Sequence, residues 1–283
     1  MTNTLLTIGQ GYSANALARR LAPQGWTLYG TTRSPDRMDA IRAEGVTPLL
    51  WPDIESALAE ATHLLASASP TDEGDPFLAK FGSNLAELAP NLEWVGYLST
   101  TGVYGDHAGA WVDESTPLTP STKRGKARKA AEEAWLATGL PVHIFRLAGI
   151  YGPGRGPFAK VRAGTARRII KEGQVFSRIH VDDIAQVLEA SIARPNPGAA
   201  YNLCDDDPAP PQDVLEHAAK LLGVAPPPAV PFEEADLSPM ARSFYAESKR
   251  VSNERIKAEL GVELIHPDYR SGLAALLAAE DSA

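Results

Sequence analysis

The chain of 283 residues contains a single cysteine, Cys204. One cysteine excludes an intramolecular disulfide and a cysteine-rich metal site, and it is typical of a protein from a reducing compartment. The sequence also lacks an apolar run approaching the 18 or so residues that a membrane-spanning helix needs. Its first residues carry no basic segment, and Gly9 interrupts the first apolar stretch too early for a signal peptide. We therefore expect a cytoplasmic protein that does not enter a membrane and holds no metal.

Positive charge is scarce, because 27 Lys and Arg residues face 35 Asp and Glu residues and give a formal net charge of −8. Such a chain is poorly suited to nucleic acid, whose binding requires many cationic contacts with phosphates. We expect a small-molecule partner instead. One segment departs from this balance: five basic side chains lie between Lys123 and Lys129.

Short apolar runs alternate with helical patterns through the first half of the chain. The pattern after the first run places Leu17 and Leu21 on one helical face. Strands that alternate with helices predict an α/β fold, a Rossmann-type doubly wound parallel sheet. After about residue 150 the pattern loosens into short helices bounded by proline-rich stretches, which predicts a smaller second lobe. The expected strands are residues 5–8, 26–31, 46–50, 63–66, 94–98 and 142–146.

The first chemical motif is the stretch TIGQGYSANALA. Gly9, Gly11 and Ala14 fit the spacing G-x-G-x-x-A directly after an expected strand and at the opening of a helix. Small residues allow a tight turn that brings a pyrophosphate against free N–H groups at the positive end of the helix. A plain glycine turn is the alternative, because this spacing alone is not specific. The cofactor contacts expected here and after the 63–66 strand are Gly9, Gly11, Tyr12, Ser13, Ala14, Ala66 and Ser67.

The end of the second expected strand indicates which cofactor is bound. A cofactor without a 2′-phosphate usually meets an acidic residue at this point, but the sequence here has Thr32 and Arg33. A guanidinium beside small hydroxyl residues suits a phosphate, so we expect NADP rather than NAD. Two alternatives remain: Arg33 is a solvated loop residue, or Asp36 binds a ribose hydroxyl of NAD.

Several motifs in a fixed order carry a family resemblance. They are GQGYSA, YLSTTGVYGD, the basic segment, RLAGIYGPGR, RIHVDDIA and YNLCDDDP. The chain resembles the extended and atypical short-chain dehydrogenase/reductases, the NAD-dependent epimerase/dehydratase-like group. The resemblance implies a dinucleotide-binding Rossmann domain in residues 1–150 and a smaller C-terminal α/β lobe in residues 151–283. That lobe would be mainly substrate-binding, with residues from about 174 to 203 returning to the first domain. The family often forms homodimers.

The resemblance also places the family's acid–base residues. Its Ser or Thr three positions before the V-Y-G motif is Thr100 here, and its Tyr and Lys four residues apart fall on Arg124 and Arg128. In the family the hydroxyl holds the substrate oxygen, the tyrosine transfers a proton, and the lysine lowers the tyrosine's pKa and binds the ribose. A guanidinium stays protonated, so Arg124 cannot replace the tyrosine as proton acceptor.

Spacing by four places Arg124 and Arg128 on one helical face. One hypothesis is that both bind an anionic substrate; another is that Arg128 binds the ribose while Arg124 contacts the substrate. The alternative is a solvated helix face with ion pairs such as Arg128 with Glu132 and Lys129 with Glu133. The lysines of the segment are expected to be solvated.

Two further positions bear on the substrate. Tyr151, just after an expected strand, is the candidate proton donor, although the glycines after it also fit a simple turn requirement. In family members that act on nucleotide-sugars, an arginine four residues before the HVDD histidine binds the diphosphate. That position is Phe176 here, and Arg178 is the residue that could compensate.

Two functions follow from the sequence. The first is an NADP-dependent reductase or epimerase/dehydratase-like enzyme acting on a small anionic substrate with Thr100, Arg124, Arg128 and Tyr151. The second is a catalytically inactive NADP(H)-binding sensor, because both members of the usual Tyr/Lys pair are replaced.

Overall fold

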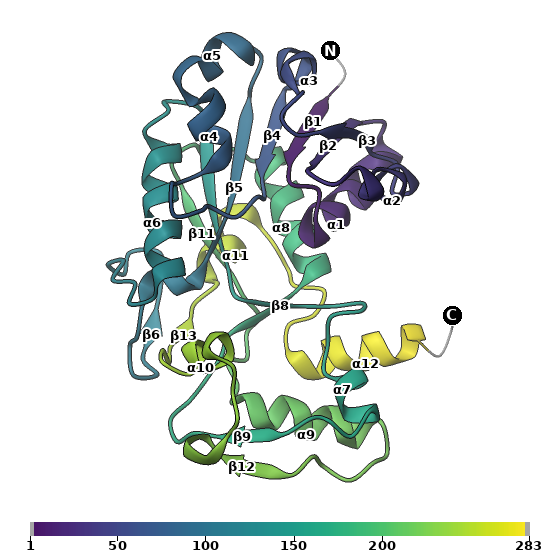
Figure 1. Ribbon diagram of the computed structural model, residues 1–283, viewed down its shortest axis with the longest axis vertical. Helices are drawn as coiled ribbons and strands as arrows, with labels where there is room; N and C mark the ends of the chain where they lie inside the picture. Colours follow the sequence, from purple (N-terminus) through teal and green to yellow (C-terminus); the bar gives the residue numbers. More distant parts are fainter. Residues whose placement is uncertain (1–2, 281–283) are drawn as a thin grey trace.

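The computed structural model describes residues 3–280 and is built on a seven-stranded, fully parallel sheet (Figure 1). The strand order is β11-β7-β5-β4-β1-β2-β3, which confirms the doubly wound fold expected from the sequence. Six strands match the predicted ones to within two residues at either end, and β11 joins the sheet beside β7. The strands are β1 (Thr4–Ile8), β2 (Thr27–Thr32), β3 (Thr47–Leu50), β4 (His63–Ala66), β5 (Trp94–Thr100), β7 (Val142–Leu147) and β11 (Ala200–Leu203).

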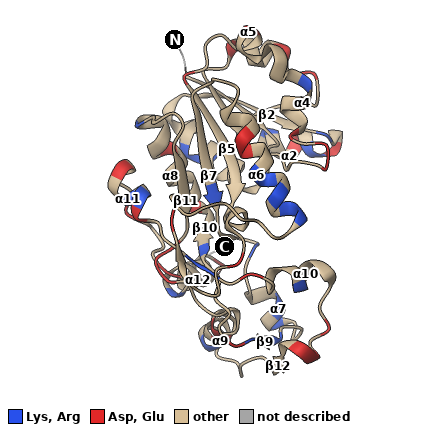
Figure 2. Cartoon of the chain, turned by 90° about the vertical axis from the view of Figure 1, so that its left-hand side faces the viewer, with Lys and Arg blue, Asp and Glu red and all other residues tan. Residues whose placement is uncertain are grey.

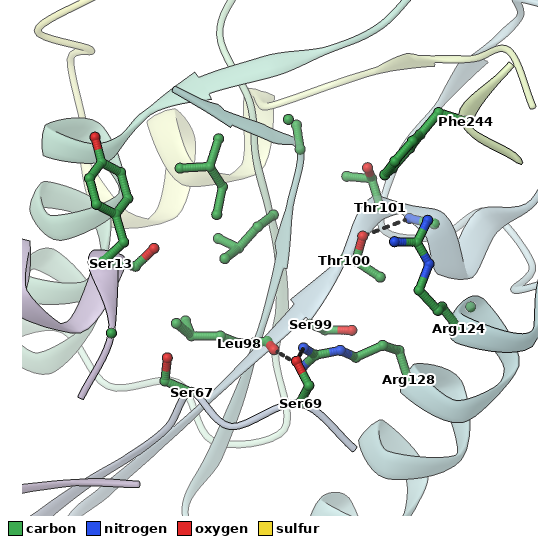
Figure 3. A pocket seen from close by; sticks show the side chains of 18 of the residues that line it. Ser13, Ser67, Ser69, Leu98, Ser99, Thr100, Thr101, Arg124, Arg128 and Phe244 are labelled. Carbon is green, nitrogen blue, oxygen red and sulfur yellow. Dashed lines mark hydrogen bonds between the residues drawn. The ribbon is translucent and has the colours of Figure 1, made fainter. Parts of the chain in front are cut away.

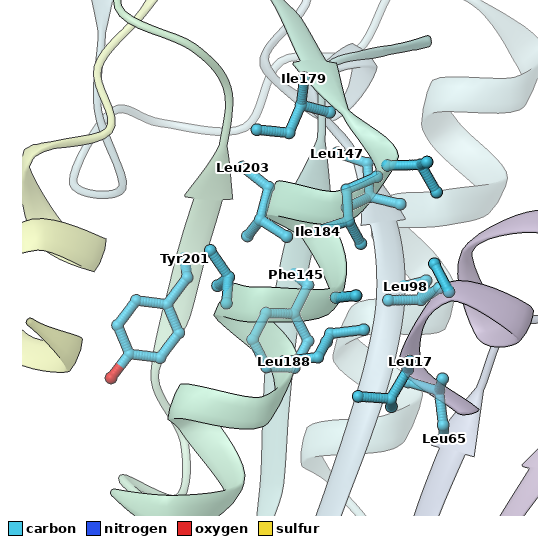
Figure 4. Packing of buried hydrophobic residues seen from close by; sticks show 14 of the residues in the cluster. Leu17, Leu65, Leu98, Phe145, Leu147, Ile179, Ile184, Leu188, Tyr201 and Leu203 are labelled. Carbon is cyan, nitrogen blue, oxygen red and sulfur yellow. The ribbon is translucent and has the colours of Figure 1, made fainter. Parts of the chain in front are cut away.

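Helices cover both faces of the sheet, because successive strand residues point to opposite sides. Leu5 packs in one apolar cluster and Leu6 in the other, which explains why the strands are continuously apolar rather than alternating. Figure 4 shows part of the first cluster, with Leu188 beside Phe145 and Leu17 beside Leu65. Helices contributing to this cluster are α1 (Tyr12–Leu21), α2 (Met38–Ala43), α8 (Val181–Ala193) and α11 (Glu254–Leu260). The other cluster includes α3 (Glu55–Glu60), α4 (Pro76–Phe81), α5 (Leu85–Leu88) and α6 (Lys123–Leu136).

A smaller lobe lies beyond the carboxyl ends of the strands (Figure 1). Its own core includes Phe158, Ala218 and Leu273, and its helices are α7 (Phe158–Arg162), α9 (Pro211–Leu221), α10 (Pro239–Phe244) and α12 (Tyr269–Glu280). Three two-stranded parallel pairs accompany them: β8 (Gly149–Tyr151) with β10 (Arg178–His180), β9 (Arg168–Ile170) with β12 (Ala229–Pro231), and β6 (Trp111–Val112) with β13 (Arg250–Val251). The short 3-10 turns are η1 (Ala22–Gln24), η2 (Pro35–Arg37), η3 (Gly82–Asn84), η4 (Thr101–Tyr104) and η5 (Phe232–Glu234). Within residues 3–280, no helix has the length and apolar character required to cross a bilayer.

A buried ion pair fixes α6 on the sheet. Arg146 of β7 and Glu132 of α6 lie 2.9 Å apart, with side chains 7% and 3% exposed. Ser99 donates a hydrogen bond to the same carboxylate, and Tyr104 accepts one of 2.9 Å from Arg146. Glu132 therefore does not pair with Arg128, so that expected i,i+4 contact is wrong: the buried carboxylate binds the cation of the sheet instead. Both the guanidinium and the carboxylate therefore have hydrogen-bond partners besides each other, as the burial of two charges requires.

Replacing Glu132 with Gln should lower the free energy of unfolding by about 3–5 kcal/mol, because Arg146 would stay buried without a counter-ion. The matched control is Glu44→Gln, which removes the partner of Arg19 in an ion pair of 3.0 Å whose side chains are 49% and 31% exposed. That change should cost less than about 1 kcal/mol. Urea unfolding measures both, and equal losses would contradict the structural role given to Glu132.

Candidate active site

A cleft of about 1590 Å³ lies where the sheet meets the lobe. Residues at the carboxyl ends of β1, β2, β4, β5 and β7 line one side, and segments of the lobe line the other. Ligands of open α/β sheets bind at this edge. The volume exceeds the ~300–1000 Å³ typical of a single small-molecule site, so the cleft has room for a cofactor and a substrate together.

The glycine loop turns from β1 into α1 at the floor of this cleft. Gly9 has a φ of +88°, and a Cβ there would lie 3.1 Å from the backbone nitrogen of Ala68. Gly11 caps α1 without a side-chain hydrogen bond, so the first-turn N–H groups are available to an anion. Gly9, Gly11, Tyr12 and Ser13 all line the cleft. Ala14 is 1% exposed and packs in the core, where its small size allows helix and strand to approach closely.

The end of β2 presents two arginines to the cleft. Thr32 and Arg33 both line it, and Arg33 is exposed. Arg37 was not anticipated: η2 folds the chain back so that its guanidinium donates a 3.1 Å hydrogen bond to the carbonyl of Gln10. The signal that could have found it is the R-x-x-x-R spacing around a proline turn. Asp36, the alternative ribose partner, is exposed and is not among the residues that line the cleft.

The segment after β4 forms the neighbouring part of the floor. Ser67 lines the cleft, and its backbone N–H donates a 2.9 Å hydrogen bond to the carbonyl of Ile8. Ala66 is 2% exposed and packs under the floor rather than lining it. Ser69 follows on the cleft side.

Thr100 stands at the end of β5, half-buried and facing the cleft (Figure 3). Its hydroxyl oxygen accepts a 3.2 Å hydrogen bond from the backbone N–H of Gly102 and caps η4. The hydroxyl hydrogen remains available to hold a substrate oxygen.

Arg124 and Arg128 both face the cleft from α6, as their spacing predicts, but their contacts differ (Figure 3). Arg128 donates hydrogen bonds to the carbonyl of Leu98, to the hydroxyl of Tyr97 at 3.2 Å and to Ser69 at 2.9 Å. Arg124 is exposed and lies over the ring of Phe244, 4.6 Å from its centroid. Within residues 3–280 its guanidinium makes no hydrogen bond or ion pair, so its N–H groups are free for a ligand.

Lys123 and Lys126 of the segment are solvated as expected, whereas Lys129 is half-buried and donates a 3.2 Å hydrogen bond to the carbonyl of Leu118. Figure 2 shows this run of cations along α6. Lys123 pairs with Asp72 at 2.6 Å, with side chains 80% and 72% exposed. Lys129 lies 3.9 Å from Glu133, as the i,i+4 spacing suggests, and Lys126 is exposed.

Tyr151 does not suit the role of proton donor given to it from the sequence. It lines the cleft but is only 7% exposed, and its hydroxyl donates to the carbonyl of Asp268 at 3.4 Å. A Cβ on Gly272 would overlap that hydroxyl, so α12 packs directly against it. Burial raises the pKa of Tyr151, which makes it a weaker acid. The tyrosine acts as a packing residue between the sheet and the lobe.

Arg178 is also used differently from the expectation. It borders the cleft, but its guanidinium donates hydrogen bonds of 2.9 Å and 3.0 Å to the carbonyls of Phe176 and Ala209. Asp205 lies near it, 1% exposed, with neither carboxylate oxygen hydrogen-bonded inside residues 3–280. Burial raises the pKa of Asp205 to about 8, against the opposing charge of Arg178. Arg178 therefore stabilises the backbone at Phe176 and does not supply a free cation in place of the arginine that this position lacks.

The Asp205 carboxyl should make stability fall as the pH rises. Its raised pKa means that the folded chain retains a proton that the unfolded chain releases above about pH 4, so the loss occurs between about pH 4 and the folded pKa of about 8. Asp205→Asn cannot ionise and should be more stable than the natural chain at pH 9 by more than about 1 kcal/mol. Urea unfolding across this range measures the difference.

Asp36→Asn, at an exposed loop position, is the control and should leave the pH profile unchanged. Parallel profiles for Asp205→Asn and the natural chain would show that Asp205 does not hold a proton in the folded state.

Comparisons with known proteins place these features in a family. No family model matches the chain. YeeZ of Escherichia coli K12 is 30% identical over 278 residues, covering 92% of this chain and 95% of the relative. A Streptomyces protein, 3-diazoavenalumate denitrifying reductase, is 30% identical over 184 residues, covering 60% of this chain and 58% of the relative.

Solved structures extend the likeness. A functionally unknown conserved protein from Silicibacter pomeroyi DSS is 63% identical with a TM-score of 0.95, covering 98% of this chain and 99% of that one. A Methylobacillus flagellatus protein named as an NAD-dependent epimerase/dehydratase is 29% identical with a TM-score of 0.72, covering 99% and 100% of the two chains. Human epimerase family protein SDR39U1, solved with NADPH, is 17% identical with a TM-score of 0.76 over 96% and 98%, and shows the shared fold alone. The chain belongs to the extended short-chain dehydrogenase/reductase-like family, together with the NAD-dependent epimerases and dehydratases.

Proposed function

We propose that the protein is an NADP-dependent reductase or epimerase/dehydratase-like enzyme that acts on a small anionic substrate. The observation that carries this proposal is Arg124. Its guanidinium faces the cleft at the position where the family has its tyrosine, and within residues 3–280 no side chain neutralises it. A free guanidinium beside a hydroxyl at a strand end is suited to hold a carboxylate or phosphate while the hydroxyl holds the reacting oxygen.

The residues at the sheet edge fit NADP. The uncapped first turn of α1 offers N–H groups to the pyrophosphate, and the glycine at position 9 permits close approach. Arg33 and Arg37 provide two cations for a 2′-phosphate, which an acidic residue would repel. When bound, the cofactor supplies the hydride chemistry.

The chain's own residues contribute positioning and charge. Thr100 donates to a carbonyl or hydroxyl oxygen of the substrate, and Arg124 binds its anionic group. Arg128 holds the ends of β4 and β5 together through Ser69 and Leu98, so it shapes the floor rather than contacting the substrate. The Streptomyces relative, named as a reductase, supports redox chemistry in this family branch.

A cofactor-binding sensor without turnover is the second candidate. It is favoured by the loss of both the tyrosine and the lysine, together with the burial of the Tyr151 hydroxyl against Asp268. Under this alternative the cleft would still bind NADP(H) and an anion.

Cofactor choice is tested by titrating the protein with NADPH and NADH and following nicotinamide fluorescence. We expect tighter binding of NADPH. Arg33→Ala and Arg37→Ala should each weaken NADPH binding by about 10- to 100-fold, the value of a lost charge-assisted hydrogen bond, and should leave NADH within about twofold. The control is Arg42→Ala, an exposed arginine of α2 paired with Asp39. Equal affinity for both cofactors in all variants would rule out the phosphate site.

Turnover is tested by screening carbonyl-containing carboxylates and phosphates for loss of NADPH absorbance. Arg124→Gln should lower kcat/KM for the active compound by at least about tenfold, without changing NADPH affinity, because one charge-assisted contact is lost. Lys126→Gln, an exposed cation of the same helix, should have no effect. Tight NADPH binding with no oxidation by any compound would favour the sensor.

A further inference from the structure

Among the aromatic side chains on the lobe side of the cleft are Phe176, Phe244 and Tyr245, which we call the aromatic wall. The rings of Phe176 and Tyr245 meet edge to face, with centroids 5.6 Å apart. Phe244 is 51% exposed, and the other two are half-buried. The wall therefore leaves ring surface uncovered inside a concave site.

From this wall and its position beside Arg124, we infer that the substrate is an aromatic carboxylate, whose ring packs on Phe176, Phe244 and Tyr245 while its carboxylate binds Arg124. The inference rests on the proposed function, because it names the substrate class of the same site. Apolar surface exposed within a cleft and bordered by a few polar groups is typical of a ligand site. Aromatic rings gain additional stabilisation from stacked or edge-to-face contacts.

The wall is held in place from behind, which argues for a preformed site. The N–H and carbonyl of Phe176 exchange 3.1 Å hydrogen bonds with Ala209, and Arg178 donates to the same carbonyl of Phe176. Lys171 donates to the carbonyl of Tyr245, and the Tyr245 ring packs on Phe232 with centroids 5.2 Å apart. Ligand binding then requires little ordering of the wall.

Arg124 connects the wall to the charge. Its guanidinium lies over the ring of Phe244, and the N–H edge of the group makes no hydrogen bond or ion pair within residues 3–280. Figure 3 shows the two side chains together near Thr100 and Thr101. A carboxylate bound to that edge would carry its attached ring alongside the Phe244 ring. The planar guanidinium matches the two oxygens of a carboxylate.

Charge on the lobe side argues against a nucleotide-sugar. Phe176 stands where the family's nucleotide-sugar enzymes have an arginine for the diphosphate, and Arg178 is occupied by backbone carbonyls. Lys249, which also lines the cleft, is paired with Glu247 at 2.9 Å, and the two side chains are 11% and 10% exposed. A diphosphate near Phe176 would therefore have to displace these contacts to use Arg178 or Lys249.

The test is calorimetric titration of the NADPH complex with four probes: 3-phenylpropionate, hexanoate, 3-phenylpropanol and UDP-glucose. We expect 3-phenylpropionate to bind at least about tenfold more tightly than the acid without a ring or the alcohol without a carboxylate. UDP-glucose should bind more weakly than 3-phenylpropionate. Equal affinities for 3-phenylpropionate and hexanoate, tighter binding of UDP-glucose, or no binding of the aromatic acid at millimolar concentration would each overturn the inference.

Three variants separate the contribution of the ring from that of the carboxylate. Phe176→Leu keeps an apolar side chain of similar size and should weaken 3-phenylpropionate by about threefold to tenfold without changing hexanoate. Arg124→Gln should weaken both acids and leave the alcohol unchanged. Phe244→Leu, at an exposed position, repeats the ring test where folding is not at risk. These titrations need no turnover. Failure to oxidise NADPH would therefore count against the proposed enzyme but not against the aromatic site. A lack of selectivity for the ring would count against the aromatic site but not against the enzyme.

Discussion

The ion pair between Glu132 and Arg146 is the contact on which the rest of the site depends. It joins α6 to β7, the strand next to the edge strand β11, and Ser99 and Tyr104 complete its hydrogen bonds. A buried pair of this kind tolerates little rotation of the helix, because any displaced charge would lie unpaired in the core. The direction in which α6 presents its other side chains is therefore fixed by a residue that never reaches the cleft. The positions of Arg124 and Arg128 therefore depend on Glu132.

The two replaced dyad positions have taken different roles under this constraint. Arg128 turns inward to three acceptors, whereas Arg124 stays at the surface of the cleft against Phe244. Arg128 stabilises the ends of β4 and β5, whereas Arg124 remains available to bind a ligand. The difference follows from what each guanidinium meets: strand ends with free oxygens in one case, and an aromatic ring in the other.

The sheet was predictable because each buried strand is a continuous apolar run between helical patterns, a signal that depends only on neighbouring residues. The places of Gly9 and Arg33 in the cleft were predictable for the same reason, because both lie at a short distance from a strand end. The place of Arg37 in the cleft was not predicted, because it depends on the turn that folds the chain back after β2. The contacts of Glu132 and Tyr151 depend on segments that are distant in the sequence. Tyr151 meets Asp268, 117 positions later, and no local pattern reveals such a contact.

The contacts between α6 and the loop after β4 have a thermodynamic consequence. Arg128 binds Ser69 at one end of that loop, and Lys123 pairs with Asp72 further along it. Arg128 thus tethers the start of the loop to a helix that is itself fixed in the core, whereas the exposed pair of Lys123 and Asp72 adds little. A ligand arriving at this edge meets backbone that has already lost much of its conformational entropy, so less of its binding free energy is spent on ordering the protein.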